Sequence, residues 1–207
     1  MVKAAVLVSG GGTNLAALLA SQDSGVIRSA EIALVAADRP CQALARAEER
    51  GIRTVLLDRK ALRREAFEEG LVREIDAAGC TLIVLAGFLS ILSAAFVKRY
   101  PDHIINVHPS LIPSFCGKGF YGLHVHEAAL RRGVKITGAT VHLVNEETDG
   151  GRILKQKAVE VLCTDSPESL QKRVMEEAEW IILPQAVEEL AAEIEKKGDV
   201  NDNRRIS

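Results

Sequence analysis

Two polar side chains at one end of an apolar strand pattern are the first candidates for chemistry. Asn106 and His108 lie two positions apart in the strand pattern 104–108, and Pro109 follows them. Alternate residues of a strand point to the same face, and the proline ends the strand just beyond the pair. An amide and an imidazole placed together can donate hydrogen bonds to an oxygen that gains negative charge. The alternative is a polar strand end with a solvated histidine.

A third candidate is Asp149, which stands in a turn sequence directly before Gly150 and Gly151. Asp followed by Gly is common in turns for conformational reasons alone. If this turn folds back toward His108, its carboxylate can orient the imidazole, favour the charged imidazole, or relay a proton through water. Asn106, His108 and Asp149 are therefore candidate catalytic residues, with plain turn chemistry as the alternative for Asp149.

A glycine-rich turn near the N-terminus is the candidate anion site. It has the sequence S-G-G-G-T-N-L over residues 9–15, after a strand pattern and at the start of a helix pattern. Free N–H groups and the helix dipole at such a position favour a phosphate. We predict that Gly11, Gly12, Thr13 and Asn14 bind it, and that a side chain at Gly12 would obstruct it. A plain tight turn is the alternative.

The same turn fits a dinucleotide fingerprint poorly. Gly10 and Gly12 match its first two glycines, but Leu15 occupies the place of the third. A nicotinamide site, with Asp38 in the place of the ribose acid, is therefore a weak alternative.

The composition limits the classes of partner. The chain has 207 residues, with 26 Lys and Arg against 28 Asp and Glu, so there is no basic field to hold nucleic acid or an anionic membrane. No apolar run approaches the roughly 20 residues of a membrane helix, and the N-terminus enters a strand pattern without a leader. The four cysteines are scattered, which indicates reduced thiols rather than a zinc site. We expect a cytoplasmic protein that binds no metal.

Alternating strand and helix patterns must position the candidate residues. Strand patterns at 4–8, 32–36, 54–57, 81–86 and 104–108 alternate with helix patterns at 14–20, 40–50, 61–78 and 89–99. Continuous apolar runs indicate strands that are covered on both faces. They predict an α/β fold with an open, mostly parallel twisted sheet, Rossmann-like, with helices on both faces. Strands at 136–144 and 153–161 predict an antiparallel hairpin at the sheet edge, and 166–197 a helix interrupted by Pro184.

Three motifs in this order carry a resemblance to a known family. They are S-G-G-G-T-N-L at 9–15, N-V-H-P-S-L-I-P at 106–113, and T-G-A-T-V-H at 137–142 leading to D-G-G at 149–151. Together they resemble the phosphoribosylglycinamide formyltransferase family of folate-dependent enzymes, up to about residue 190. The resemblance implies the formyltransferase variant of the Rossmann-like fold. It also implies transfer of a formyl group from 10-formyltetrahydrofolate, as co-substrate, to the amine of 5′-phosphoribosylglycinamide in de novo purine biosynthesis.

The resemblance also implies roles for individual residues. Asn106 and protonated His108 would meet the oxyanion of a tetrahedral intermediate formed by direct attack, and Asp149 would hold His108 and help move a proton through water. Glu179 is similar to an acid that contacts the ribonucleotide, with Glu177 as the alternative. The implied folate site comprises Arg64, Phe88, Leu89, Ser90, Ile91, Leu92 and Asn106.

Two departures from the family pattern stand out. Ser90 takes the place of an arginine that is common in well-known members, and the loop 115–122 is longer and richer in glycine than in some relatives. Neither departure falls on Asn106, His108 or Asp149.

The expected organisation is one domain over 1–197. Its 1–100 half would bind the ribonucleotide phosphate, and its 101–197 half would bind folate and carry the catalytic residues. The polar tail 198–207 is predicted to fray. The expected partners are the two small-molecule substrates, with a monomer and a homodimer both left open.

Two other functions remain as alternatives. One is hydrolysis of 10-formyltetrahydrofolate, with water in place of the amine, and the other is a non-catalytic sensor of a phosphorylated metabolite. The phosphate loop argues against simple hydrolysis, whereas the catalytic set argues against a pure sensor.

Overall fold

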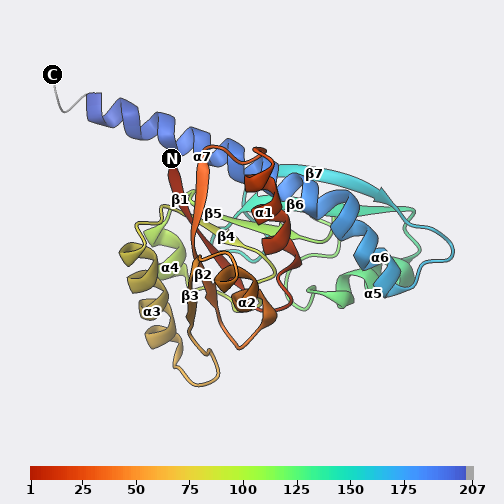
Figure 1. The fold of residues 1–207 in the computed structure, drawn as a ribbon. Coiled ribbons are helices and arrows are strands. Elements are labelled where there is room, and N and C mark those ends of the chain that lie inside the picture. The colour runs from red at the N-terminus through yellow and green to blue at the C-terminus, as the bar shows by residue number, and fades with distance from the viewer. Residues whose placement is uncertain (204–207) are drawn as a thin grey trace.

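One sheet of seven strands organises residues 1–203, the part of the chain that the computed structural model describes (Figure 1). The order across the sheet is β3-β2-β1-β4-β5-β6-β7. The strands are β1 Val2–Val8, β2 Ala30–Ala37, β3 Arg53–Leu56, β4 Leu82–Leu85, β5 Ile104–His108, β6 Ile136–Leu143 and β7 Ile153–Glu160. β1 to β5 are parallel, whereas β6 runs antiparallel to both β5 and β7. The predicted open, mostly parallel sheet with an antiparallel edge is confirmed.

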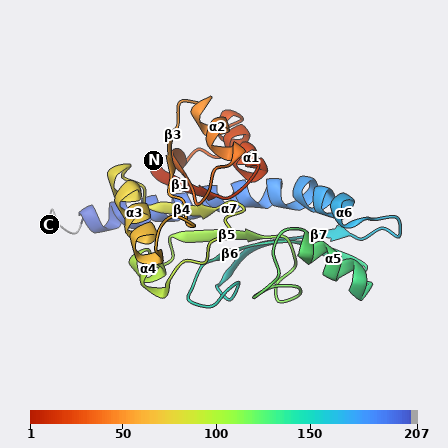
Figure 2. The same ribbon diagram turned by 90° about the horizontal axis from the view of Figure 1, so that it is seen from below.

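Helices cover both faces of this sheet (Figures 1 and 2). One face carries α1 (Thr13–Asp23), α2 (Gln42–Glu48) and α7 (Trp180–Asn203), together with α5 (Leu123–Arg132) and α6 (Pro167–Val174) near the β6–β7 hairpin. The other face carries α3 (Arg64–Ala77) and α4 (Ala94–Arg99).

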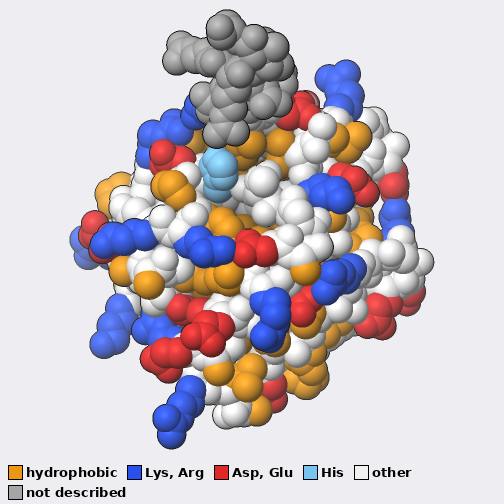
Figure 3. Space-filling model, turned by 90° about the vertical axis from the view of Figure 1, so that its left-hand side faces the viewer, with side chains coloured by type: hydrophobic (Ala, Val, Ile, Leu, Met, Phe, Trp, Pro, Cys, Tyr) orange, Lys and Arg blue, Asp and Glu red, His pale blue; other side chains and the backbone are white. Residues whose placement is uncertain are grey.

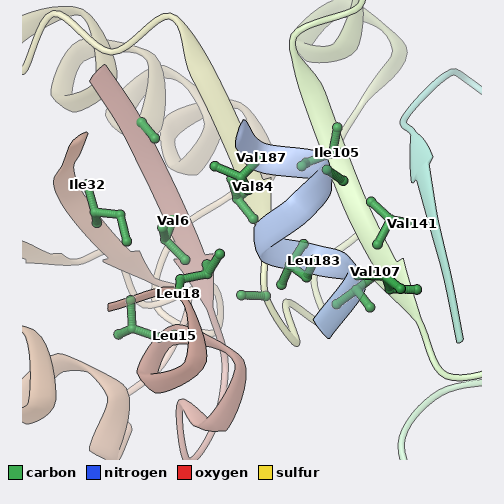
Figure 4. Packing of buried hydrophobic residues seen from close by; sticks show 14 of the residues in the cluster. Val6, Leu15, Leu18, Ile32, Val84, Ile105, Val107, Val141, Leu183 and Val187 are labelled. Atoms are coloured by element: carbon green, nitrogen blue, oxygen red, sulfur yellow. The ribbon is translucent and has the colours of Figure 1, made fainter. Parts of the chain in front are cut away.

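Strand residues alternate between two hydrophobic cores. In β1, Val6 packs beneath α1 and α7, whereas Ala5 and Leu7 pack beneath α3 and α4. Figure 4 shows the first core, where Leu18 of α1 and Leu183 of α7 reach the sheet. Burying an aliphatic side chain of this size stabilises the fold by about 1.5–3 kcal/mol. Burial on both faces explains why the strands appear as unbroken apolar runs in the sequence.

The strand order changes direction between β1 and β4, which are neighbours in the sheet but not in the sequence. In open α/β sheets, ligands bind outside the carboxyl ends of the strands near such a reversal. The glycine turn after β1, the 87–92 segment after β4 and the end of β5 all lie at this edge. The fold therefore brings the main candidate segments to one side of the sheet.

The helix expected over 89–99 is shorter than predicted. α4 begins only at Ala94, where the Ser93 Oγ caps it by accepting the Phe96 N–H at 3.1 Å. The preceding residues 87–92 form a loop, and the Leu89 N–H donates to the Ser9 Oγ at 2.8 Å. The prediction of a helix from Leu89 is wrong, because residues 87–92 form a loop that this bond ties to Ser9.

The C-terminal helices form one long segment. α6 is followed by a single π-helical turn, η1 (Met175–Glu179), and then by α7. Pro184 lies inside α7, so the expected interruption is wrong, although Pro184 still lacks the N–H for one helical bond. α7 continues to Asn203, which includes most of the tail predicted to fray, and residues 204–207 lie outside the described residues.

Charges of both signs are mixed on the face over α3 and α4 (Figure 3). Arg64 pairs with Glu68, and Arg99 pairs with Asp76. Exposed pairs of this kind contribute about 0–1 kcal/mol each. Among the helices of residues 1–203, none is long and apolar enough to cross a membrane.

A buried histidine in α5 makes the free energy of unfolding depend on pH. The His126 side chain is 0% exposed, and neither ring nitrogen has a hydrogen-bond partner among the described residues. Burial, with a smaller effect from nearby His108, lowers the pKa of His126 from 6.5 to about 4. In the unfolded chain the His126 imidazole is therefore protonated below about pH 6.5, whereas in the folded chain it is protonated only below about pH 4.

We expect the free energy of unfolding to fall by about 3 kcal/mol from this group as the pH drops through that range. Urea unfolding at about pH 7 and about pH 4.5 measures the loss. His126→Leu should remove this part of the pH dependence, whereas His124→Gln, at an exposed position of the same helix, should retain it. An unchanged pH dependence in His126→Leu would contradict the assignment.

Candidate active site

The ends of β5 and β6 bring four polar side chains together. The antiparallel register sets Asn106 opposite His142 and His108 opposite Thr140. Residues directly opposite each other on antiparallel strands share a face and make contact. The structure therefore places Asn106 and His108 at the carboxyl end of β5, where His108 is buried and Asn106 half-buried.

His142 fixes the orientation of the Asn106 amide. The His142 Nδ1 lies 2.9 Å from the Leu143 carbonyl oxygen, which can only accept, so Nδ1 carries a hydrogen. In the neutral ring Nε2 is then an acceptor, and it lies 3.1 Å from the Asn106 Nδ2. This amide nitrogen has two hydrogens, and the contact with His142 uses one of them. The second hydrogen remains to be donated to a reacting oxygen.

A backbone carbonyl fixes the tautomer of His108 in the same way. The His108 Nε2 donates to the Phe115 carbonyl oxygen at 2.8 Å. This leaves Nδ1 as the ring nitrogen that can gain or lose a proton. Burial lowers the pKa of His108 below its ordinary value, although the Phe115 carbonyl and the Asp149 charge oppose this. Burial thus works against the protonated ring that the family resemblance implies, whereas the Asp149 charge favours it.

Asp149 lies in the turn between β6 and β7, close to both imidazoles. Its Oδ2 lies 3.7 Å from the His108 Nδ1, and its Oδ1 lies 3.6 Å from the His142 Nε2. Oδ2 also accepts the Gly117 N–H at 2.8 Å. Burial raises the pKa of Asp149, but His142, the Gly117 N–H and the charge of His108 outweigh it, so the pKa lies below its ordinary value. An ionised carboxylate thus stands between the two rings.

Two segments of the main chain lie so close together at this turn that one position must be glycine. A Cβ on Gly151 would lie 1.7 Å from the Leu143 carbonyl oxygen, which no side chain permits. Asp149 itself has a φ of 57°, in the left-handed region that Asp tolerates better than most residues. The D-G-G sequence is therefore what lets the turn fold back toward His108.

Three residues that contact the candidate catalytic side chains had no role predicted from the sequence. His142 was part of a quoted motif, but no role was predicted for it, because the register of β6 against β5 is not visible in a sequence. Phe115 and Gly117 act through main-chain atoms, which carry no residue-type signal. The long 115–117 portion of the loop thus contacts two of the three predicted catalytic side chains.

The glycine turn after β1 has the geometry of an anion site. Gly12 is the N-cap of α1 with a φ of 73°, and it gives the helix no side-chain cap. The first N–H groups of an α-helix have no partner within the helix, so Thr13 and Asn14 can offer theirs to a phosphate. Arg46 donates from Nε to the Gly11 carbonyl oxygen at 3.0 Å, which holds the turn in place.

The expectation for Gly12 needs a correction. A Cβ at Gly12 would lie 2.7 Å from the Ala43 Cβ, so a larger residue there would disturb the packing of α2 as well as any bound phosphate. Gly11 is the cleaner position, because a Cβ there meets nothing within 4 Å.

We expect Gly11→Ala to raise the KM for a phosphorylated substrate roughly tenfold, with kcat almost unchanged. The added methyl group would crowd the anion without straining the fold. Steady-state kinetics and a thermal melt measure both effects, and Ser24→Ala at the other end of α1 is the control. An unchanged KM in Gly11→Ala would remove the turn from the phosphate site.

Glu179 reaches the same turn from η1. Its Oε2 accepts the Asn14 Nδ2 hydrogen at 2.7 Å, and the carboxyl is buried, whereas Glu177 is exposed. Burial raises the pKa of Glu179 to about 7, against a smaller lowering by Asn14. A carboxyl that is about half protonated near pH 7 repels a neighbouring phosphate less than a fully ionised one does. Of the two candidate acids, Glu179 is the one beside the phosphate turn.

The residues expected to bind folate gather around the 87–92 loop. Arg64 donates from Nη2 to the Ile91 carbonyl oxygen at 3.2 Å, and Phe88 stacks on Phe67 with ring centroids 6.4 Å apart. Leu89 and Ile91 are 47% and 71% exposed, so both offer apolar surface to a ligand. Leu92 instead packs against the α3–α4 core, and Ser90 donates to Asp38.

Other features of the described residues lie apart from this cluster. A groove of about 910 Å³ between α3 and α4 has Arg64 and Ser93 on its wall, but none of Asn106, His108 and Asp149. Within the described residues, no group of three or more His, Cys, Asp or Glu is arranged to hold a metal ion.

Comparisons with known proteins identify the family. The family model described as formyl transferase matches residues 2–187. A chloroplastic phosphoribosylglycinamide formyltransferase of Arabidopsis thaliana is 40% identical over 178 residues, which is 84% of this chain. The phosphoribosylglycinamide formyltransferase of Escherichia coli K12 is 38% identical over 170 residues, which is 82% of this chain and 78% of that protein.

A solved structure shows the same fold. Glycinamide ribonucleotide transformylase 1 from Symbiobacterium toebii superposes with a TM-score of 0.86 at 37% identity, over 93% of this chain and 88% of that chain. The match spans 61% of the length of the Arabidopsis relative and 18% of a trifunctional purine biosynthetic protein of Gallus gallus, to which the chain is 42% identical. The chain belongs to the formyl transferase family, within which it is similar to the phosphoribosylglycinamide formyltransferases.

Proposed function

We propose that this chain transfers the formyl group of 10-formyltetrahydrofolate to the amine of 5′-phosphoribosylglycinamide, as part of purine biosynthesis. The observation that carries the proposal is the cluster of Asn106, His108 and Asp149. In it, one Asn106 hydrogen and the His108 Nδ1 remain for a substrate while their other bonds are made within the protein. Names of similar proteins support the choice of substrates.

The ribonucleotide is expected to bind across the start of α1. Its phosphate accepts hydrogen bonds from Gly11, Gly12, Thr13 and Asn14, and Glu179 contacts the same substrate beside Asn14. The folate is expected to lie along the 87–92 loop, against the exposed side chains of Leu89 and Ile91 and near Arg64. Holding both substrates in contact supplies a large share of the rate.

The chemistry starts with direct attack of the glycyl amine on the formyl carbon. A carbon–nitrogen bond forms while the carbonyl electron pair moves to oxygen. Asn106 donates its second amide hydrogen to this oxyanion, and His108 donates from Nδ1 once the developing charge favours its protonation. Since the amine itself attacks, no covalent bond to the protein forms.

Asp149 then supports collapse of the tetrahedral intermediate. Its charge stabilises the imidazolium of His108, and it helps to carry the proton lost by the amine toward the leaving folate nitrogen through water. That nitrogen keeps the electron pair of the broken carbon–nitrogen bond and takes up the proton. The products are formylated ribonucleotide and tetrahydrofolate.

This proposal concerns two small-molecule substrates in the cytoplasm, where the four thiols of the chain, which are unpaired in the structure, remain reduced. Neither a metal nor a nucleic acid enters the reaction.

One assay separates this function from its alternatives. The protein is incubated with 10-formyltetrahydrofolate, with and without 5′-phosphoribosylglycinamide, and tetrahydrofolate formation is followed. We expect turnover only when the ribonucleotide is present. Turnover that is independent of the ribonucleotide would show hydrolysis, and ribonucleotide binding without any turnover would show a sensor.

A further inference from the structure

A fully buried carboxylate joins the two proposed substrate loops. Asp38 follows β2, and its side chain is 0% exposed. Its Oδ2 accepts the Ser90 hydroxyl at 2.6 Å, and the Ser9 side chain lies near enough to this carboxylate to help lower its pKa. Ser9 begins the phosphate turn after β1, and Ser90 lies in the 87–92 loop after β4. A single side chain thus bonds to the 87–92 loop and lies beside the phosphate turn across the strand reversal.

The two loops are also bonded directly to each other. The Leu89 N–H donates to the Ser9 Oγ at 2.8 Å, so a main-chain group of the 87–92 loop bonds to a side chain of the phosphate turn. Hydrogen bonds in which one partner is ionised are about twice as strong as neutral ones. This makes the carboxylate the strongest acceptor in the connection between the loops.

Asp38 remains ionised despite its burial. Burial raises the pKa of Asp38, but hydrogen bonds from Arg39, Ser90 and Ser9 outweigh it and bring the pKa below its ordinary value. Arg39 supplies two of these bonds, from Nε at 3.0 Å and Nη2 at 3.1 Å. A buried charge without such partners would strongly destabilise the fold. The groups that bond to the Asp38 carboxylate are therefore costly to move away from it.

We propose that Asp38 is a positioning residue that sets the distance between the ribonucleotide loop and the folate loop. This inference rests on the proposed function, in which the amine held by one loop must meet the formyl carbon held by the other. A misplacement of about 1 Å in such a reaction can cost roughly 100-fold in rate. Ser90 takes part through its hydroxyl, whereas the family resemblance implies an arginine at this position.

The test compares Asp38→Asn and Ser90→Ala with a matched control. Asp165→Asn is the control, because the Asp165 side chain is only 2% exposed, pairs with Arg173 and accepts a serine hydroxyl, yet lies beside α6 away from both loops. We expect Asp38→Asn to lower kcat by about 10–100-fold and to raise the KM of both substrates. Ser90→Ala should change the same constants less, and the double variant should be no worse than Asp38→Asn.

A purely structural role for Asp38 predicts a different result. Asp38→Asn would then melt earlier, as Asp165→Asn does, while kcat and both KM values stayed within about twofold of the wild type. That outcome would overturn the inference. If Asp38→Asn fails to fold, Ser90→Ala decides by the same criterion, because it removes one hydroxyl from a loop.

Hydrogen exchange of the Leu89 amide provides a readout that does not depend on catalysis. We expect Asp38→Asn and Ser90→Ala to speed this exchange, whereas Asp165→Asn should leave it unchanged. Faster exchange in a protein without ribonucleotide-dependent turnover would mean that the proposed function fails while the connection between the loops stands. Unchanged exchange in both variants would overturn the connection itself.

Discussion

His108→Ala is expected to lower the kcat of formyl transfer by about 1000-fold, with little change in the KM of either substrate. The His108 Nε2 is committed to the Phe115 carbonyl, so Nδ1 is the donor that can meet the oxyanion. That interaction exists only once negative charge has formed on the oxygen. Its loss therefore appears in kcat rather than in KM.

Steady-state kinetics of the purified variant measures this effect. His103→Ala is the matched control, since His103 lies just before the opposite end of β5. A circular dichroism melt shows whether His108→Ala remains folded. A kcat within about tenfold of the wild type in a folded His108→Ala protein would remove His108 from the chemical step.

Asp149→Asn is expected to lower kcat by about 100-fold and to move the pH–rate profile. The carboxylate lies 3.7 Å from the His108 Nδ1, and its charge raises the pKa of His108 against the lowering by burial. Without that charge, the pKa of His108 drops further. As the pH rises, His108 then loses its proton earlier than in the wild type. The basic limb of the pH profile of kcat therefore shifts to lower pH.

The pH dependence of kcat for Asp149→Asn and for Glu147→Gln tests the direction of this shift. Glu147 is an exposed carboxylate of the same turn, so its variant changes the net charge equally without removing the contact with His108. We expect a normal profile for Glu147→Gln. A basic limb of Asp149→Asn that stays in place, or moves to higher pH, would contradict the assigned role.

The sequence predicted the sheet because its strands are covered on both faces. Val6 and Leu7 face opposite cores, and such strands leave unbroken apolar runs that are easily recognised. Helix α5 was missed, because its start at Leu123 follows a glycine-rich loop and its paired histidines obscure the apolar face. Residues 89–92 were predicted as the start of a helix because nothing in their composition indicates the bond from Leu89 to Ser9.

In the candidate site, too, local features were predictable from the sequence and tertiary contacts were not. Strand alternation made Asn106 and His108 candidates and a turn sequence made Asp149 one, whereas the family resemblance implied their joint role. The cross-strand contact between Asn106 and His142 depends on how β6 aligns with β5, which is a tertiary property. Asp38 was noticed only as a weak ribose ligand, because its bond to Ser90 and its position beside Ser9 require the folded sheet.

The loop that follows β5 holds His108 and Asp149 through a carbonyl of Phe115 and an amide of Gly117. Every residue type carries the same carbonyl, and every residue except proline carries the same amide. The number of residues between these two contacts therefore matters more than the side chains that the loop displays. The exposed Lys118, just beyond them, can accept substitutions or a reporter group, whereas deletion of Cys116, between them, would change the spacing of the groups that contact His108 and Asp149.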